Sequence, residues 1–269
     1  MYPSSTYAVV YKGKDPNSYY DSIFSNQQTM AVINKYWNKF ADEIREGRGE
    51  FDPEKLAQVT LDDADIPTLK PLITFSDFYT KSQVAKYNAV RAKLSIPTLT
   101  DLSTVLTERE KAQLMLQAIL AVVKGHFIRQ RITINGHGLS GHSYNIETRK
   151  FAQSRGWFYT ENYYGLYNAP VEAPKTLGFP ADFASSIFFK AIMGERRGFE
   201  KYRDSSDFTS SQNEWGHLLV SVDASQSKFY GGVVVVKQQP KDGDQDSPFN
   251  SYRFNSIDMM FKVGNNNKS

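Results

Sequence analysis

The 269-residue sequence contains no cysteine. This absence excludes a disulfide framework, a thiol nucleophile and a metal site built from thiolates. The chain has no internal repeat, and Met1 to Lys14 lack the basic region and apolar run of a signal peptide. We therefore expect synthesis in the cytoplasm with no signal peptide.

The excess of charge of one sign is also small. Lysine and arginine number 32 against 29 aspartate and glutamate residues, which leaves a net charge of +3. Such a charge does not by itself imply binding to nucleic acid or to anionic lipid. The length is sufficient for one large hydrophobic core, so we predict a single α+β domain over residues 1–269, with any subdivision near residues 169–179.

Aromatic residues, in contrast, are abundant. They make up 14% of the chain, with 16 tyrosines and 18 phenylalanines. Aromatic side chains bring a large buried area, and tyrosine tolerates partly hydrated positions, so both are enriched at protein interfaces. The surplus favours a protein that works through contacts with other subunits.

The segment Thr107–Arg131 is the centre of the predicted fold. Between Ala112 and Val123 only Gln113 and Gln117 are polar, so a helix here would be apolar on nearly every side. Thr107 and Glu110 have the spacing of a capping box. Two glutamines in the middle and charges at both ends predict a buried core helix, and we expect no membrane span.

Shorter patterns indicate the other elements. Apolar residues at steps of three and four predict helices from Met30 to Ile44, from Ser76 or Thr80 to Leu94, over 146–154, and from Pro180 to Gly194. Alternating or β-branched runs predict strands at Tyr7–Tyr11, Arg131–Asn135, Trp157–Thr160, His217–Asp223, Phe229–Gln239 and 252–263.

The arrangement of these strands can be predicted further. The pair before and after residues 224–228 is expected to form a hairpin, and the last strand changes parity near Asn255, which indicates a bulge. The order of elements favours an α+β fold over a regular βαβ repeat. We predict a central buried helix packed with other helices against a mainly antiparallel sheet.

The loop Gly136–Ser143 is the most unusual stretch and the candidate for chemistry. It carries His137, Ser140 and His142, which are the candidate catalytic residues of an effector-type transferase or hydrolase. The histidine spacing matches no metal signature, and no acidic ligand lies beside it in the sequence. We therefore predict neither a metal nor a cofactor.

Two resemblances bear on this loop. Gly136-His137-Gly138-Leu139-Ser140-Gly141 is similar to the nucleophile elbow of lipases, but glycine occupies the nucleophile position at 138. His137-Gly138 followed by Trp157-Phe158-Tyr159 resembles elements of diphtheria-type ADP-ribosyltransferases. That resemblance implies Glu214 as the catalytic glutamate.

Basic residues near tyrosines provide a different reading. Bases of single-stranded nucleic acid or RNA can stack on tyrosine while lysine and arginine contact phosphates. The candidate nucleic-acid-binding residues are Lys81, Lys86, Arg91, Lys93, Arg129 and Arg131.

Three functions follow from these patterns. The first is a structural subunit of a large assembly, such as a virus or phage particle, without catalysis and with self-association or other subunits as partners. The alternatives are a nucleic-acid-binding protein and an enzyme with its site in the Gly136–Ser143 loop. The aromatic surplus and the lack of an active-site motif favour the first.

Overall fold

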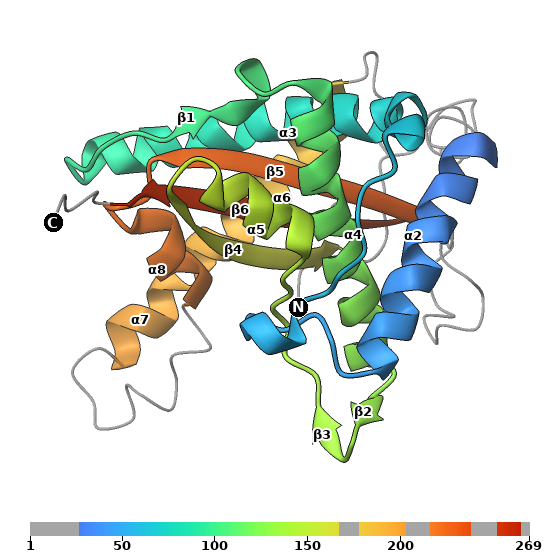
Figure 1. Ribbon diagram of the computed structural model, residues 1–269. Coiled ribbons are helices and arrows are strands. Elements are labelled where there is room, and N and C mark those ends of the chain that lie inside the picture. The colour runs from blue at the N-terminus through green and yellow to red at the C-terminus, as the bar shows by residue number, and fades with distance from the viewer. Residues whose placement is uncertain (1–26, 167–177, 203–215, 238–251, 265–269) are drawn as a thin grey trace, which may run out of the picture.

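The computed structural model describes residues 27–166, 178–202, 216–237 and 252–264 (Figure 1). The predicted strand Tyr7–Tyr11 and Glu214 lie outside these residues. The helices are α2 (Gln27–Arg45), α3 (Ile66–Lys93), α4 (Glu108–Arg129), α5 (Ile146–Gln153), α6 (Gly178–Gly194), α7 (Arg196–Tyr202) and α8 (Gly216–Val222). Three short 3₁₀ helices are η2 (Pro53–Lys55), η3 (Asp63–Asp65) and η4 (Leu102–Thr104).

The strands form one larger sheet and one small hairpin. They are β1 (Thr100–Asp101), β2 (Thr133–Ile134), β3 (His137–Gly138), β4 (Trp157–Leu166), β5 (Lys228–Lys237) and β6 (Tyr252–Val263). The larger sheet has the order β1-β5-β6-β4, and only the short β1–β5 pair is parallel. The predicted α+β class with a mainly antiparallel sheet is confirmed.

Helices cover both faces of this sheet. The side chain missing at Gly232 would point at Ala118 of α4, whereas the one missing at Gly231 would point at Tyr79 of α3. Successive residues of a strand face opposite sides, so α4 and α3 lie on opposite faces. Helices α2 and α5 pack beside α4, while α6 and α8 pack beside α3.

Helix α4 is the predicted central helix, and its burial is confirmed. Every apolar residue from Ala112 to Val123 is at most 2% exposed. The capping box is present, with the Thr107 hydroxyl accepting from the Glu110 N–H and the Glu110 carboxylate accepting from the Thr107 N–H. Within the described residues, no helix has both the length and the apolar composition needed to cross a membrane.

One predicted helix and one predicted strand differ from the structure. Helix α3 begins at Ile66, ten residues before Ser76, and continues through Pro71, because buried residues such as Leu72 anchor its first turns in the core. The predicted strand His217–Asp223 was wrong, since these residues form α8 and β5 pairs with β6 instead.

The predicted bulge near Asn255 was also wrong. The register of β6 runs without interruption against both β4 and β5. Residues of both parities from Asn255 to Phe261 are buried, because β6 is a central strand with helices on both faces. Burial on both faces explains the change of parity in the sequence.

Candidate functional site

On one side of the sheet, the short strand β1 pairs only with Lys228 and Phe229 of β5, and helix α3 closes the edge of β5 beyond it. The Thr80 hydroxyl accepts from the N–H of Gly231 at 2.9 Å and donates to its carbonyl at 3.2 Å. The Ser76 hydroxyl accepts from the N–H of Val233 at 2.9 Å. Two helix hydroxyls therefore take the place of an edge strand and satisfy backbone groups that would otherwise be open to pairing.

The opposite edge is formed by β4, and its pairing shows which groups face outward. The Gly264 N–H donates to the Gly156 carbonyl at 2.9 Å, and these two residues continue the β4–β6 register. Hydrogen-bonded pairs alternate along an antiparallel ladder, so Phe158 and Thr160 point their backbone groups toward β6. The backbone groups of Trp157 and Tyr159 therefore point away from the sheet.

Among the described residues, none pairs with this outward edge at the start of β4. No described residue is hydrogen-bonded to the backbone groups of Trp157 or Tyr159. Two residues further along, Glu161 and Asn162 are buried, with exposures of 3% and 2%. The unpaired part of the strand is thus limited to the first four residues of β4. We call these residues, Trp157–Thr160, the β4 edge.

Apolar side chains surround the β4 edge. Phe158 is 59% exposed, and Val263 on the adjacent end of β6 is 56% exposed. The Lys262 ammonium lies 5.8 Å from the centre of the Phe158 ring, and Lys228 lies 5.0 Å from that of Trp157. Trp157 is half-buried, so Phe158 is the exposed ring of this edge, and an exposed ring next to a lysine is suited to contact another molecule.

A buried carboxylate, Asp258, organises the face of the sheet under α3. It accepts from the hydroxyls of Tyr79 at 2.6 Å and Tyr87 at 2.7 Å and from the Gln83 amide at 3.0 Å. Burial raises the pKa of Asp258 and of both tyrosines. Gln83 in turn accepts from Ser185 of α6 at 2.8 Å, so this network ties α3 and α6 to the sheet.

A second buried carboxylate, Glu161, lies on the other face, under α4. It accepts from the Ser143 N–H at 3.0 Å, from the Gln117 amide at 3.1 Å and from the Tyr159 hydroxyl. The His142 Nδ1 is 3.6 Å away, and this carboxylate raises the pKa of His142. Both carboxylate oxygens are occupied by groups that hold the loop against α4.

Lys124 is buried beside this network. Its ammonium donates to the carbonyls of Gly49 at 3.0 Å and His142 at 2.7 Å, and it lies 3.0 Å from the Glu50 carboxylate. Burial lowers the pKa of Lys124. The three donors of the ammonium are used, so this lysine joins two loops to the end of α4.

The Gly136–Ser143 loop begins with a short hairpin that extends from the body of the protein (Figure 1). Asn135 and Gly136 have φ values of 52° and 76°, which is the geometry of a two-residue type I′ turn and explains the Asn-Gly pair. His137 lies on this exposed hairpin, while the Ser140 hydroxyl accepts from the His142 N–H at 3.2 Å.

The three candidate catalytic residues are therefore not joined into one site. Only His142 contacts an ionisable group, Glu161, and no described contact links it to His137. Glu161 and Lys124 were not among the candidates, because nothing in the local sequence distinguishes a buried glutamate on a strand from an exposed one. The described residues also contain no group of three or more histidine, aspartate or glutamate side chains placed to hold a metal.

The candidate nucleic-acid-binding residues are likewise not brought together on one surface. Arg91 was expected on an exposed basic stripe, but its side chain is fully buried. It donates to the carbonyls of Pro97, Ser221, Asp223 and Gln226, at 2.6 to 3.1 Å. Arg91 thus holds the end of α8 and the following loop, and it is not accessible to a phosphate.

The remaining basic candidates do not form one stripe. Lys86 and Lys93 are seven residues apart and share a side of α3, whereas Lys81 lies about 140° around the helix from Lys86. Arg131 is exposed after the end of α4, and the side chain of Arg129 lies outside the described contacts. Binding of nucleic acid by these residues stays a prediction.

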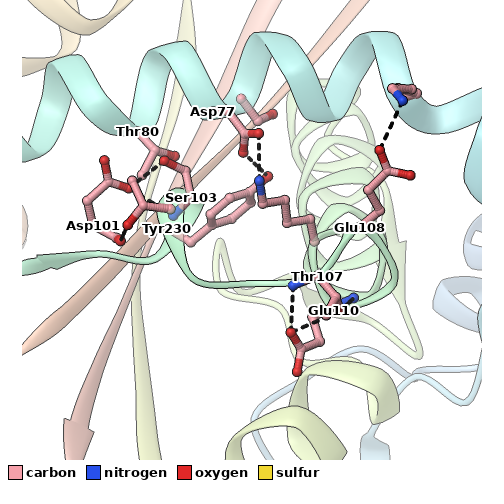
Figure 2. A network of polar contacts seen from close by, with 12 residues as sticks. Asp77, Thr80, Asp101, Ser103, Thr107, Glu108, Glu110 and Tyr230 are labelled. Atoms are coloured by element: carbon pink, nitrogen blue, oxygen red, sulfur yellow. Dashed lines mark hydrogen bonds and ion pairs between the residues drawn. The ribbon is translucent and has the colours of Figure 1, made fainter.

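A third polar cluster lies where α3 meets the start of α4 (Figure 2). Asp77 is 2.7 Å from the Lys111 ammonium and accepts from the Tyr230 hydroxyl at 3.4 Å. Burial raises the pKa of Asp77. Asp101 accepts from the Ser103 N–H at 2.8 Å and begins η4. These contacts connect neighbouring elements, as in the two networks on the sheet.

Comparison of the chain with protein-family models, with curated proteins and with solved structures gave no match. The function must therefore be inferred from the chain's own geometry. Of the features described above, the β4 edge is the one whose outward backbone groups have no hydrogen-bond partner among the described residues, and its Phe158 is exposed.

Proposed function

We propose that this protein is a structural subunit that assembles by association with further copies of itself, without catalysis. The observation that carries the proposal is the asymmetry of the sheet. The β5 edge is closed by Thr80 and Ser76 of α3, while no described residue pairs with the β4 edge, which carries the exposed Phe158 and lies beside the exposed Val263. An open edge beside apolar side chains favours pairing with another chain.

The buried polar networks support a structural role. Asp258, Glu161 and Lys124 carry groups that serve catalysis in many enzymes, but their hydrogen bonds go to helices, strands and loops of this chain. A carboxylate or ammonium that is fully engaged in such contacts stabilises the arrangement of the elements. The aromatic surplus of the sequence is consistent with the same function.

Sedimentation velocity over a wide range of concentrations tests the proposal. The purified chain should form oligomers. Phe158→Ser should raise their dissociation constant by about tenfold or more, as expected for an exposed aromatic contact residue. Phe78→Ser is the matched control, because Phe78 is also a phenylalanine and is 42% exposed, but lies on α3.

The control variant should associate like the wild type. A wild-type chain that remains monomeric at every concentration would contradict the proposal. Equal weakening by Phe158→Ser and Phe78→Ser would show that the association does not depend on the β4 edge.

A further inference from the structure

We infer that the partner at the β4 edge is a second copy of this chain, paired strand to strand about a two-fold axis at Phe158. The inference rests on the proposed function and specifies its first interface. It follows from the length of the open edge and from the direction of its backbone groups.

The open edge is short, which limits the register of any pairing. Trp157 and Tyr159 carry the outward backbone groups, and pairing beyond them is limited by the burial of Glu161 and Asn162. A strand that pairs with itself in the antiparallel sense about Phe158 places Trp157 of each copy opposite Tyr159 of the other. Each of these two pairs can exchange two hydrogen bonds, so the outward groups of both residues would be satisfied in both copies.

Other two-fold registers satisfy fewer groups. A pairing centred on Thr160 would place Tyr159 opposite the buried Glu161 and Phe158 opposite the buried Asn162. A pairing centred on Phe158 instead joins the most exposed aromatic residue of the described chain to its own copy. The same surface on both copies then forms the contact, as two-fold symmetry requires.

Charge is compatible with this arrangement. Lys262, on β6, lies across from Phe158 and rests near its ring. The two copies of Lys262 would be separated by both copies of β4, a distance of about 14 Å at the usual spacing between strands. That separation exceeds the Debye length at physiological ionic strength, about 8 Å, so repulsion between them is weak.

The β4 edge lacks some of the devices that keep edge strands apart, while Lys228 and Lys262 lie beside it and the buried Glu161 follows it. The residues of the β4 edge include no proline and no charged residue, and the β4–β6 register contains no bulge. Natural proteins use such features to prevent pairing between edges. Their absence at the β4 edge contrasts with the cover that α3 provides at the β5 edge.

A cysteine scan tests the register, since the chain has no cysteine of its own. In the proposed ladder Phe158 occupies a non-hydrogen-bonded position opposite itself, where the two Cα atoms would be about 4.5 Å apart. This distance lies within the range that a disulfide spans. Phe158→Cys, tested at a concentration well above the dissociation constant measured for Phe158→Ser, should therefore form a covalent dimer under mild oxidation, read by non-reducing electrophoresis.

Two variants serve as controls. In Thr160→Cys the two cysteines would be four residues out of register, about 13 Å apart, and should not cross-link. In Phe78→Cys the new thiol lies on α3, away from the edge. Circular dichroism of each variant checks that the fold is retained, as expected for substitutions of residues that are not fully buried.

The outcomes separate this inference from the proposed function. Rapid dimer formation by Phe158→Cys alone supports the two-fold pairing. Cross-linking by Thr160→Cys alone, or oligomers in the wild type with no cross-linking by either edge variant, overturns the pairing and leaves self-association in place. A wild-type chain that sediments as a monomer at every concentration overturns both.

Discussion

At the scale of single residues, charged side chains in this protein hold the fold together from within. Arg91 is the clearest case, because a fully buried guanidinium bonds four backbone carbonyls from two segments. Lys86 and Lys93 are basic and lie on the same helix, so a stripe of phosphate contacts was a reasonable prediction. Helical position alone could not show that this residue turns inward toward α8.

Replacement of Arg91 should therefore affect stability. Arg91→Met leaves carbonyls buried without donors, and each unsatisfied group costs about 1–3 kcal/mol. For four carbonyls we expect a loss of about 4 kcal/mol or more in the free energy of unfolding, measured by urea denaturation. Lys93→Met is the control and should change it by less than about 0.5 kcal/mol, because Lys93 is exposed. Similar values for the two variants would contradict the structural role of Arg91.

A second residue-scale prediction concerns pH. The Glu161 carboxylate raises the pKa of His142 in the folded protein. A raised pKa means that protonated His142 stabilises the fold below the unfolded value of about 6.5, and that this contribution is lost as the pH rises through the folded pKa. The free energy of unfolding should thus fall over this range in the wild type, as followed by denaturation at several pH values.

His142→Gln should flatten this dependence. His137→Gln is the control, because His137 is exposed on the hairpin and forms no ion pair among the described residues. It should follow the wild-type curve. A fall in stability that persists in His142→Gln would show that another group titrates in this range.

At the scale of elements, α3 has two roles that its sequence does not reveal. It covers a face of the sheet with Tyr79 and closes the β5 edge with Thr80 and Ser76. Gly231 makes this close approach possible, because a side chain there would collide with the Tyr79 ring. Tyr79 cannot move aside without losing its hydrogen bond to Asp258.

Gly231→Ala should therefore destabilise the protein. Overpacking of a buried site costs about 1–3 kcal/mol, and we expect the upper end of that range, measured as a decrease in the free energy of unfolding. Gly138→Ala is the matched control, since a Cβ at Gly138 meets no atom within 4 Å. Comparable stability of the two variants would mean that α3 can shift away from β5.

The predicted elements differ in how strongly the sequence specifies them. Helix α4 was predicted with its capping box because apolar residues and caps agree over more than five turns. Helix α8 was predicted as a strand, because its β-branched residues suit both structures. The carbonyls of Ser221 in α8 and of Asp223 just after it accept hydrogen bonds from Arg91, more than a hundred residues earlier, and no local pattern reports such a contact.

At the scale of the whole molecule, the two edges of the sheet differ in a way that matters for function. Helix α3 lies along β5, whereas the start of β4 forms the outer edge on the other side (Figure 1). This asymmetry predicts that copies of the chain associate through the β4 edge and not through the β5 edge. The association would then give dimers through β4, while any larger assembly requires contacts elsewhere on the surface.

The sequence alone determined the fold class, the central helix and the lack of thiol chemistry. These properties depend on composition and on periodicity within one segment, which are local quantities. The tertiary structure decided which charges are buried, that His137, Ser140 and His142 are not brought together, and which sheet edge is left open. These depend on contacts between distant segments, such as Thr80 with Gly231, whose partners cannot be identified until the chain is folded.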